Sequence, residues 1–169
     1  MVLVPDVGII MGSDSDLPVM KQAAEVLERF GINFEMSIIS AHRTPHRAQS
    51  YAMSAKTRGV KVIIAGAGGA AHLPGVLASF TTAPVIGVPI MTPTLNGVDS
   101  LYSIVQMPGG IPVATVGIDN ALNAGLLAAQ IIALNDAGVH DKLLSYKGEM
   151  EKNVEKKSAR LETLGYKDY

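Results

Sequence analysis

The sequence predicts an α/β domain in which helices cover both faces of a five-stranded parallel sheet. Five short apolar runs of strand length recur along the 169-residue chain. Segments whose apolar residues recur at helical spacing separate these runs, and strands alternating with helices are typical of a parallel sheet. Hydrophobic residues form 48% of the chain and charged residues only 17%, which excludes a disordered chain.

The first strand is predicted at residues 7–11, where the run is apolar throughout, as in a strand buried on both faces. A helix follows from Leu17, because apolar residues recur on one helical face and Gly31 is a favourable stop. Residues 32–38 alternate between apolar and polar side chains, which predicts a second strand with one polar face.

The next helix is predicted to begin at Thr44 and Pro45, which suit its N-cap and first helical position, and to end at Gly59. Residues 60–65 form the third apolar run and predict the third strand. A glycine-rich turn follows this strand and leads into a helix at residues 73–80.

The last part of the domain is predicted to contain strands at residues 84–88 and 112–116, joined by a long connection with a short helix at residues 100–106. Asp119 is predicted to cap a long helix that ends at Gly138.

Right-handed crossovers between five such strands favour the flavodoxin-like strand order 2-1-3-4-5, a three-layer, doubly wound sheet. We expect a single domain over residues 1–169, with a core at about residues 5–138 and a charged C-terminal helix as an extension at about residues 139–169. Four apolar residues form a narrow stripe on this extension: Met150, Val154, Leu161 and Leu164. Such a stripe packs either on its own domain or on a neighbouring subunit.

The charges are distributed unevenly along the chain. Residues 141–169 hold 13 of the 29 charged residues, whereas residues 62–135 hold two, Asp99 and Asp119. Because so few charges cannot cover the outside of a monomer, we expect the charge-poor segment to lie against other copies in a homo-oligomer.

Composition also excludes several classes of function. A net charge of -1 argues against nucleic acid or an anionic membrane as a partner. The absence of cysteine excludes disulfides, thiolate metal sites and thiol nucleophiles. No apolar segment reaches about 18 unbroken residues and no signal peptide is evident, so we expect no membrane span and a cytoplasmic location.

Three unusual segments follow the first three strands: Gly12–Asp16, Ser40–Pro45 and Gly66–His72. Ligands of open α/β sheets bind outside the carboxyl ends of the strands, where the strand order reverses. In the predicted order the first strand lies between the second and the third, so these segments would meet at one edge. Their convergence is the main argument from the residues for a binding site.

The first two segments carry groups suited to a phosphorylated sugar. Ser13 offers a hydroxyl beside a helix N-terminus, which suits a phosphate, and Asp16 suits sugar hydroxyls. The alternative is that Ser15 or Asp16 only caps the helix, and both roles can coexist. Arg43 can hold a phosphate through two parallel hydrogen bonds.

His42 is the natural proton carrier of the predicted site, because histidine is the side chain that titrates nearest to neutral pH. The alternative is a purely structural histidine with satisfied hydrogen bonds. A metal site is not expected, because His42 and His46 flank the start of a helix and need not share a face, and no H-E-x-x-H pattern exists.

The third segment contains three glycines in four residues, which lets the backbone approach another group closely. Three interpretations remain open: a dinucleotide fingerprint, close packing of helix on strand, or a loop whose amides face a small anionic group. The dinucleotide interpretation lacks an acidic residue about 20 positions further on. The residues by themselves indicate a phosphorylated ribose or a similar ligand, one histidine for proton transfer and no cofactor, and they do not name a reaction.

Four motifs resemble those of the class I N5-carboxyaminoimidazole ribonucleotide mutases of the PurE family. They are Gly8–Asp16, Ser40–Pro45, Gly66–Gly75 and Asp99–Pro108, within a likeness that covers about residues 7–135. The resemblance implies a flavodoxin-like fold, a homo-octamer and cofactor-free transfer of a carboxylate from N5 to C4 of an aminoimidazole ribonucleotide.

The resemblance also implies roles for individual residues. His42 would act as the general acid and base. The residues that would contact the substrate are Ser13, Ser40 and Arg43 at the phosphate, Asp16 at the ribose, and Gly68, Gly69 and Ala70, with His72 nearby, at the carboxylate. Two alternatives are a class II carboxylase, which uses free carbon dioxide, and a ribonucleotide-binding module without catalysis.

Overall fold

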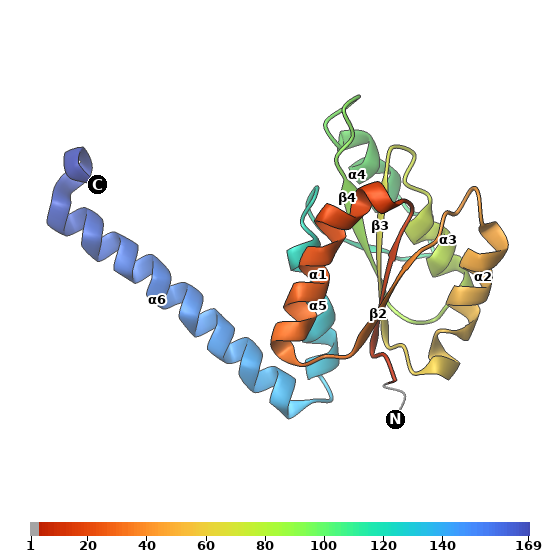
Figure 1. Cartoon of the computed structure of the whole chain (residues 1–169), viewed down its shortest axis with the longest axis horizontal. Coiled ribbons are helices and arrows are strands. Elements are labelled where there is room, and N and C mark those ends of the chain that lie inside the picture. The colour runs from red at the N-terminus through yellow and green to blue at the C-terminus, as the bar shows by residue number, and fades with distance from the viewer. Residues whose placement is uncertain (1–3) are drawn as a thin grey trace.

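The computed structural model describes residues 4–169, which contain a five-stranded parallel sheet with the strand order β2-β1-β3-β4-β5 (Figure 1). This confirms the predicted fold class and strand order. The strands are β1 (Val7–Met11), β2 (Phe34–Ile38), β3 (Val62–Gly68), β4 (Val85–Ile90) and β5 (Ala114–Thr115). The fifth strand is shorter than predicted, because it lies at the sheet edge and Pro112 has no N–H to donate to β4.

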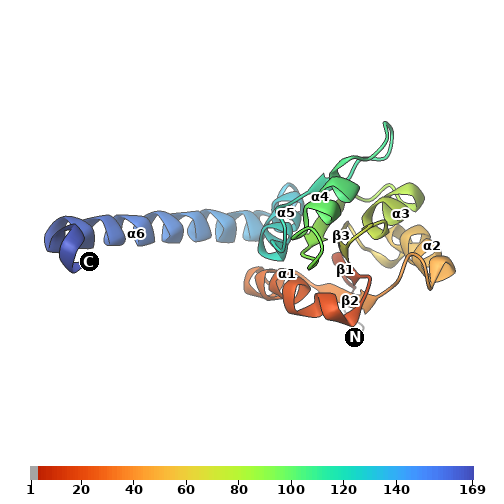
Figure 2. The same ribbon diagram turned by 90° about the horizontal axis from the view of Figure 1, so that it is seen from above.

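Helices cover both faces of this sheet, as Figures 1 and 2 show. They are α1 (Leu17–Phe30), α2 (Pro45–Ser54), α3 (Leu73–Phe80), α4 (Val98–Val105), α5 (Ala121–Ala133) and α6 (Ala137–Asp168). Two short 3-10 turns, η1 (Asp14–Asp16) and η2 (Lys56–Arg58), flank α1 and α2. Helices α1 and α5 pack on one face, and α2 and α3 pack on the other (Figure 1).

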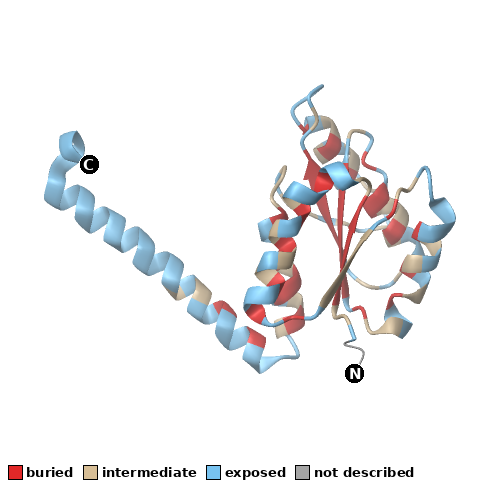
Figure 3. Ribbon diagram, in the orientation of Figure 1, coloured by how far each residue is buried: buried red, intermediate tan, exposed pale blue. Residues whose placement is uncertain are grey.

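The apolar runs of the central strands are explained by burial on both faces. In β1, Ile9 belongs to the core under α1 and α5, and Ile10 belongs to the core under α2 and α3. In β3, Ile64 and Ile63 divide between the two cores in the same way. Because successive side chains of a strand point to opposite faces, a strand between two helical layers needs an apolar residue at every position (Figure 3).

The predicted helix stop at Gly31 is confirmed, since this residue ends α1 with a φ of 72°. The second helix ends earlier than predicted, at Ser54, and the separate η2 turn leads to Gly59, which has a φ of 90°. Glycine adopts this left-handed conformation at no steric cost, so the chain can turn sharply into the next strand.

The prediction for the long helix after Asp119 is wrong at both ends. Asn120 caps α5, while Asp119 has a φ of 55° and accepts a hydrogen bond of 2.8 Å from the Met91 N–H. The helix ends at Ala133, and Gly138 lies inside α6. Asp136 causes this break, because its extended backbone and its bond from the Val139 N–H begin a new helix.

Helix α6 leaves the domain after its first turns (Figures 1 and 2). Val139 and Leu143 are buried against the core, and Lys142 Nζ donates to the Phe30 carbonyl at 2.7 Å. Tyr146 is half-buried and packs edge to face on Phe30. From Glu149 onward the helix is exposed (Figure 3). The exposed part includes the stripe of Met150, Val154, Leu161 and Leu164. Across residues 4–169, no helix combines the length and the apolar character that a membrane span needs.

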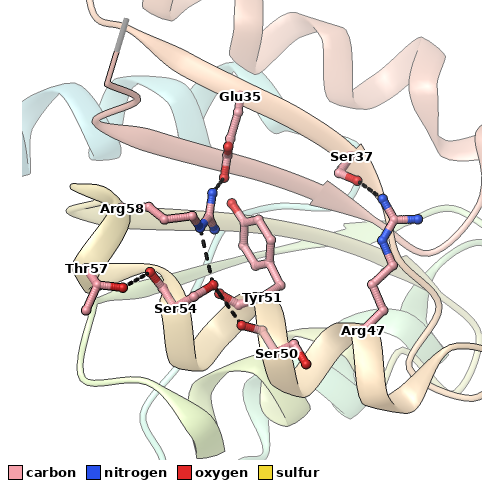
Figure 4. A network of polar contacts seen from close by, with 8 residues as sticks. All are labelled: Glu35, Ser37, Arg47, Ser50, Tyr51, Ser54, Thr57 and Arg58. Atoms are coloured by element: carbon pink, nitrogen blue, oxygen red, sulfur yellow. Dashed lines mark hydrogen bonds and ion pairs between the residues drawn. The ribbon is translucent and has the colours of Figure 1, made fainter. Parts of the chain in front are cut away.

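A polar cluster fills the space between β2 and α2 (Figure 4). Arg58 is ion-paired with Glu35, and its guanidinium lies 4.6 Å from the centre of the Tyr51 ring. The Tyr51 hydroxyl is buried without a hydrogen-bond partner among the described residues, and burial raises the pKa of Tyr51. This hydroxyl lies over Gly8 of β1, where a Cβ would stand 2.0 Å from it.

We expect Gly8→Ala to destabilise the chain by about 1–3 kcal/mol, because the new methyl group would displace the Tyr51 ring. The measurement is the midpoint of urea-induced unfolding. The control is Gly148→Ala in α6, where no atom lies within 4 Å of the new Cβ and where alanine should stabilise the helix by about 0.5–1 kcal/mol. Because Tyr51→Phe removes the clashing hydroxyl, Gly8→Ala should cost less in that background, and an equal cost would contradict this explanation.

Candidate active site

The segments that follow β1, β2 and β3 meet at one edge of the sheet around a cavity of about 640 Å³. The predicted site residues that line it are Ser13, Asp16, Ser40, His42, Arg43, Gly68 and His72. Gly69 and Ala70 are not among the lining residues, whereas Ala67 and Ala71 are. The convergence predicted from the strand order is therefore present in the structure.

The first segment forms a reciprocal cap around η1. The Ser13 hydroxyl accepts a hydrogen bond from the Ser15 N–H at 3.3 Å, and the Asp16 carboxylate accepts one from the Ser13 N–H at 3.1 Å. Ser13 is thus the N-cap of η1. Asp16, one of the two predicted caps, occupies the N-cap position of α1 but makes no side-chain capping bond there. Ser13 and Asp16 also line the cavity, so capping and ligand contact are compatible at these two residues.

Asp16 is an unusual carboxylate, because its residue is only 7% exposed and yet the side chain borders the cavity. Burial raises the pKa of Asp16, and the hydrogen bonds from Ser13 and Ser15 only partly oppose this effect. A buried carboxylate with free acceptor capacity suits hydroxyl donors such as those of a ribose.

The second segment holds Arg43 through a network with Ser40. The Ser40 hydroxyl accepts from the Arg43 backbone N–H at 3.1 Å and from Arg43 Nε at 3.4 Å. Arg43 Nη2 reaches the Gly12 carbonyl at 3.4 Å, which places the guanidinium beside the end of β1. Among the described residues no carboxylate pairs with Arg43, so its charge is available to an anion.

Thr44 is not the side-chain cap that its position predicted. Its hydroxyl donates to the Ser40 carbonyl at 2.9 Å and accepts from the Ser40 N–H at 3.0 Å. These bonds close the loop between β2 and α2 on itself, and Pro45 begins α2 without a side-chain cap. The closed loop presents His42 and Arg43 together on the cavity side.

His42 and His72 form a hydrogen-bonded pair across the cavity. His42 Nε2 lies 2.7 Å from His72 Nδ1, and the rings meet edge to face at 81°. One of the two nitrogens must carry the proton that the other accepts. The pair brings together residues from the second and third segments and provides a path along which a proton can move.

The third segment is held from outside the cavity. The Gly69 N–H donates to the Ser100 hydroxyl at 2.9 Å, so this amide is already paired within the protein. Gly69 and Ala71 have φ values of 68° and 39°, which makes this a sharp turn between β3 and α3. Gly68 lines the cavity, and a Cβ there would lie 3.1 Å from the Thr92 side chain.

A fourth wall of the cavity comes from Ile90–Pro93 at the end of β4. No motif in the sequence pointed to it, although β4 neighbours β3 in the predicted strand order. Thr92 in this wall donates to the Asp99 carboxylate at 3.1 Å, which ties the wall to α4. Within residues 4–169, no three acidic or histidine side chains gather as a metal site would require.

The fold and the cavity define a flavodoxin-like α/β protein with a ligand site where the strand order reverses. The pattern of the family described as AIR carboxylase matches residues 6–153, and the chain belongs to this family.

Similar proteins agree with this assignment. The N5-carboxyaminoimidazole ribonucleotide mutase of Thermotoga maritima is 64% identical over 165 residues, which are 98% of this chain and 96% of the relative. The mutase of the same name from Pyrococcus horikoshii is 62% identical over 98% of this chain and 93% of its own. The crystal structure of Treponema denticola PurE has a TM-score of 0.85 and 32% identity, covering 93% of this chain and 98% of that one. The family resemblance drawn from the four motifs is confirmed.

We expect Asp16→Asn to stabilise the folded chain at neutral pH and to weaken ligand binding. Because the folded-state pKa of Asp16 is raised, the folded chain holds this proton more tightly than the unfolded chain. Stability from this group is therefore present at low pH and lost as the pH rises through the raised pKa. Urea unfolding should show the gain at neutral pH and its disappearance on acidification, and a less stable variant at neutral pH would contradict the burial argument.

Proposed function

We propose that this chain is an N5-carboxyaminoimidazole ribonucleotide mutase of de novo purine biosynthesis. It would convert N5-carboxyaminoimidazole ribonucleotide into 4-carboxy-5-aminoimidazole ribonucleotide. The observation that carries the proposal is the cavity in which a hydrogen-bonded histidine and an arginine lie on one loop, opposite a glycine-rich turn. Within residues 4–169 this arginine has no carboxylate partner. The relatives that share 61–64% of its residues carry the name of this activity.

In this proposal the substrate is held by its phosphate and ribose. Arg43 supplies the positive charge, and the hydroxyls of Ser13 and Ser40 lie beside it at the ends of β1 and β2. Asp16 accepts hydrogen bonds from the ribose hydroxyls. These contacts would place the aminoimidazole ring toward the third segment and His42.

The proposed chemistry needs one proton carrier. The bond between N5 and the carboxyl carbon breaks, its electron pair stays on N5, and His42 delivers a proton there while carbon dioxide is released. C4 then attacks the carbon dioxide, which forms the new carbon–carbon bond and a carboxylate. The proton lost from C4 returns to His42, so the reaction is an isomerisation that consumes no cofactor.

The wall near Gly68 and Ala71 would hold the carbon dioxide between these two steps. Its residues have little or no side chain, so the backbone can lie close to a small molecule and exclude water. Gly69 and Ala70 belong to the same turn but do not line the cavity, and the Gly69 amide is hydrogen-bonded to Ser100 outside it.

The decisive experiment follows the C4-carboxylated product after the chain is mixed with N5-carboxyaminoimidazole ribonucleotide, with neither ATP nor added metal. A second arm supplies aminoimidazole ribonucleotide and bicarbonate. Rapid product in the first arm and slow product in the second is expected for the mutase. The reverse pattern would indicate a class II carboxylase, and binding without product would indicate a ribonucleotide-binding module.

We expect His42→Asn to bind the ribonucleotide but to lower kcat at least about a hundredfold, because it removes the proton carrier.

Arg43→Ala should instead weaken binding roughly tenfold or more, because it removes a charge-assisted contact to the phosphate. Steady-state kinetics and calorimetric titration separate the two effects.

Matched controls lie one helical turn further on, since His46 and Arg47 are exposed and do not line the cavity. His46→Asn and Arg47→Ala should keep normal kcat and KM. Near-normal turnover by His42→Asn would reject its role, and unchanged affinity in Arg43→Ala would reject the phosphate contact.

We further propose that the chain forms a single domain with a C-terminal helical extension and acts in the cytoplasm as a homo-octamer. Two features support self-association. The segment with almost no charge includes β3, β4 and α5, and exposes Tyr102, Val105 and Leu134, which are 51–80% exposed. The stripe on α6 is 41–66% exposed on a helix that stands away from its own domain (Figure 2). We assign this stripe to contact with another copy.

Light scattering should give a particle of about eight times the 17.7 kDa chain mass. Replacing Val154 and Leu161 by lysine should shift the particle to a smaller size, because it places charges within the apolar stripe. Replacing the neighbouring Glu155 by lysine leaves the stripe intact and is the control. A monomer at micromolar concentration of the unaltered chain would refute the assembly.

A further inference from the structure

The side chain of Ser100 is completely buried, with 0% exposure, and lies outside the lining of the cavity. Its hydroxyl donates to the Ile90 carbonyl at 2.7 Å and accepts from the Gly69 N–H at 2.9 Å. Ile90 is the last residue of β4, and Gly69 is the first residue after β3. One hydroxyl from the first turn of α4 therefore joins the two neighbouring strands at the point where both reach the cavity.

A second serine of α4 contacts the same glycine. Ser103, one turn after Ser100, donates to the Gly69 carbonyl at 3.4 Å. Gly69 is thus held at both its N–H and its carbonyl by one face of α4. Ala71, two residues further on, has a positive φ of 39°, a conformation that a residue with a side chain keeps only where its surroundings over-determine it. The two serines supply part of that constraint by holding the turn at Gly69.

The held turn leads directly to the reacting groups of the proposed mechanism. Gly68, immediately before Gly69, and Ala71 line the cavity. His72 follows, and its ring is hydrogen-bonded to His42. A shift of Gly69 would move the wall of the carbon dioxide site and the partner of the general acid together.

We propose that Ser100 is a positioning residue for the carboxylate transfer. Its hydroxyl fixes the turn from Gly68 to His72 so that carbon dioxide released from N5 stays beside C4 until the new bond forms. This role rests on the proposed mutase function. A residue that only stabilised the fold would affect the amount of folded protein and leave the fate of the carbon dioxide unchanged.

The test compares Ser100→Ala, which nearly keeps the volume of serine but removes the hydroxyl, with Ser100→Cys, whose larger thiol is only a weak hydrogen-bonding group. The measured quantity is the ratio of C4-carboxylated product to free aminoimidazole ribonucleotide above the uncatalysed background. We expect this ratio to fall in the order Ser, Cys, Ala, with kcat of Ser100→Ala reduced roughly tenfold or more and KM little changed, because misplacement by about 1 Å is costly in catalysis. Ser79→Ala is the control, since this exposed hydroxyl of α3 donates to the Val76 carbonyl of its own helix and has no other hydrogen bond among the described residues.

An independent arm needs no activity. In Ser100→Ala the amides of residues 68–72 should exchange with solvent deuterium faster, while those of α5 keep their rates. Unchanged exchange would overturn the anchoring by Ser100, and an unchanged product ratio despite faster exchange would overturn its role in the reaction. If the unaltered chain forms no C4-carboxylated product, the mutase proposal fails separately, and the exchange arm still decides whether Ser100 holds the turn.

Discussion

The parallel pairing of β1 with both of its neighbours is the constraint on which the rest of the site depends. Met11 at the end of β1 is in register with Ile38 of β2 and with Gly66 of β3. The ladder continues past the strand ends, where the Gly12 N–H donates to the Gly66 carbonyl and the Ile39 N–H donates to the Met11 carbonyl. Three loops that are distant in sequence therefore leave the sheet at one level, and their side chains are placed within reach of one another before any of them contacts a ligand.

Two different loops supply the charged side chains of the site. Arg43 reaches the end of β1 without a carboxylate partner among the described residues, and Asp16 is buried at the base of the same cavity. The two side chains are oriented by different hydrogen bonds. The Ser40 hydroxyl and the Gly12 carbonyl accept from Arg43, whereas the Asp16 carboxylate accepts from the Ser13 N–H in the reciprocal cap. A ligand with an anionic end and a hydroxylated middle matches this order of groups, which is the chemistry of a phosphorylated ribose.

Most of the fold was predictable because the strands and helices are locally consistent. The central strands are apolar at every position, and Gly31 and Gly59 end helices through a conformation that glycine adopts freely. One error falls where a distant contact decides the local structure. Asp119 adopts a positive φ and bonds to the Met91 amide, which no pattern near residue 119 encodes.

The contrast between local patterns and distant contacts also explains which residues of the candidate site could be predicted. His42, Arg43, Ser13 and Asp16 were predictable because they follow strands whose order could be deduced. Ser100 lies within the fourth motif but received no predicted role, because its partner Gly69 is 31 residues away in the sequence and its own side chain does not line the cavity. Ile90–Pro93 was also missed, since its contribution comes from its place beside β3 and its residues carry no recognisable chemistry.

The departure of α6 from its domain has a consequence for how the chain folds. After Glu149 the helix has hydrogen bonds along its own backbone but every residue is exposed, so it has no buried apolar face within the same chain. Isolated helices are only marginally stable in water, because little beyond local hydrogen bonding offsets the loss of conformational entropy. The core can therefore form in a unimolecular step. In the proposed oligomer, full ordering of this arm would be coupled to contact with another chain, so its helix content would depend on protein concentration and assembly would be the last stage of folding.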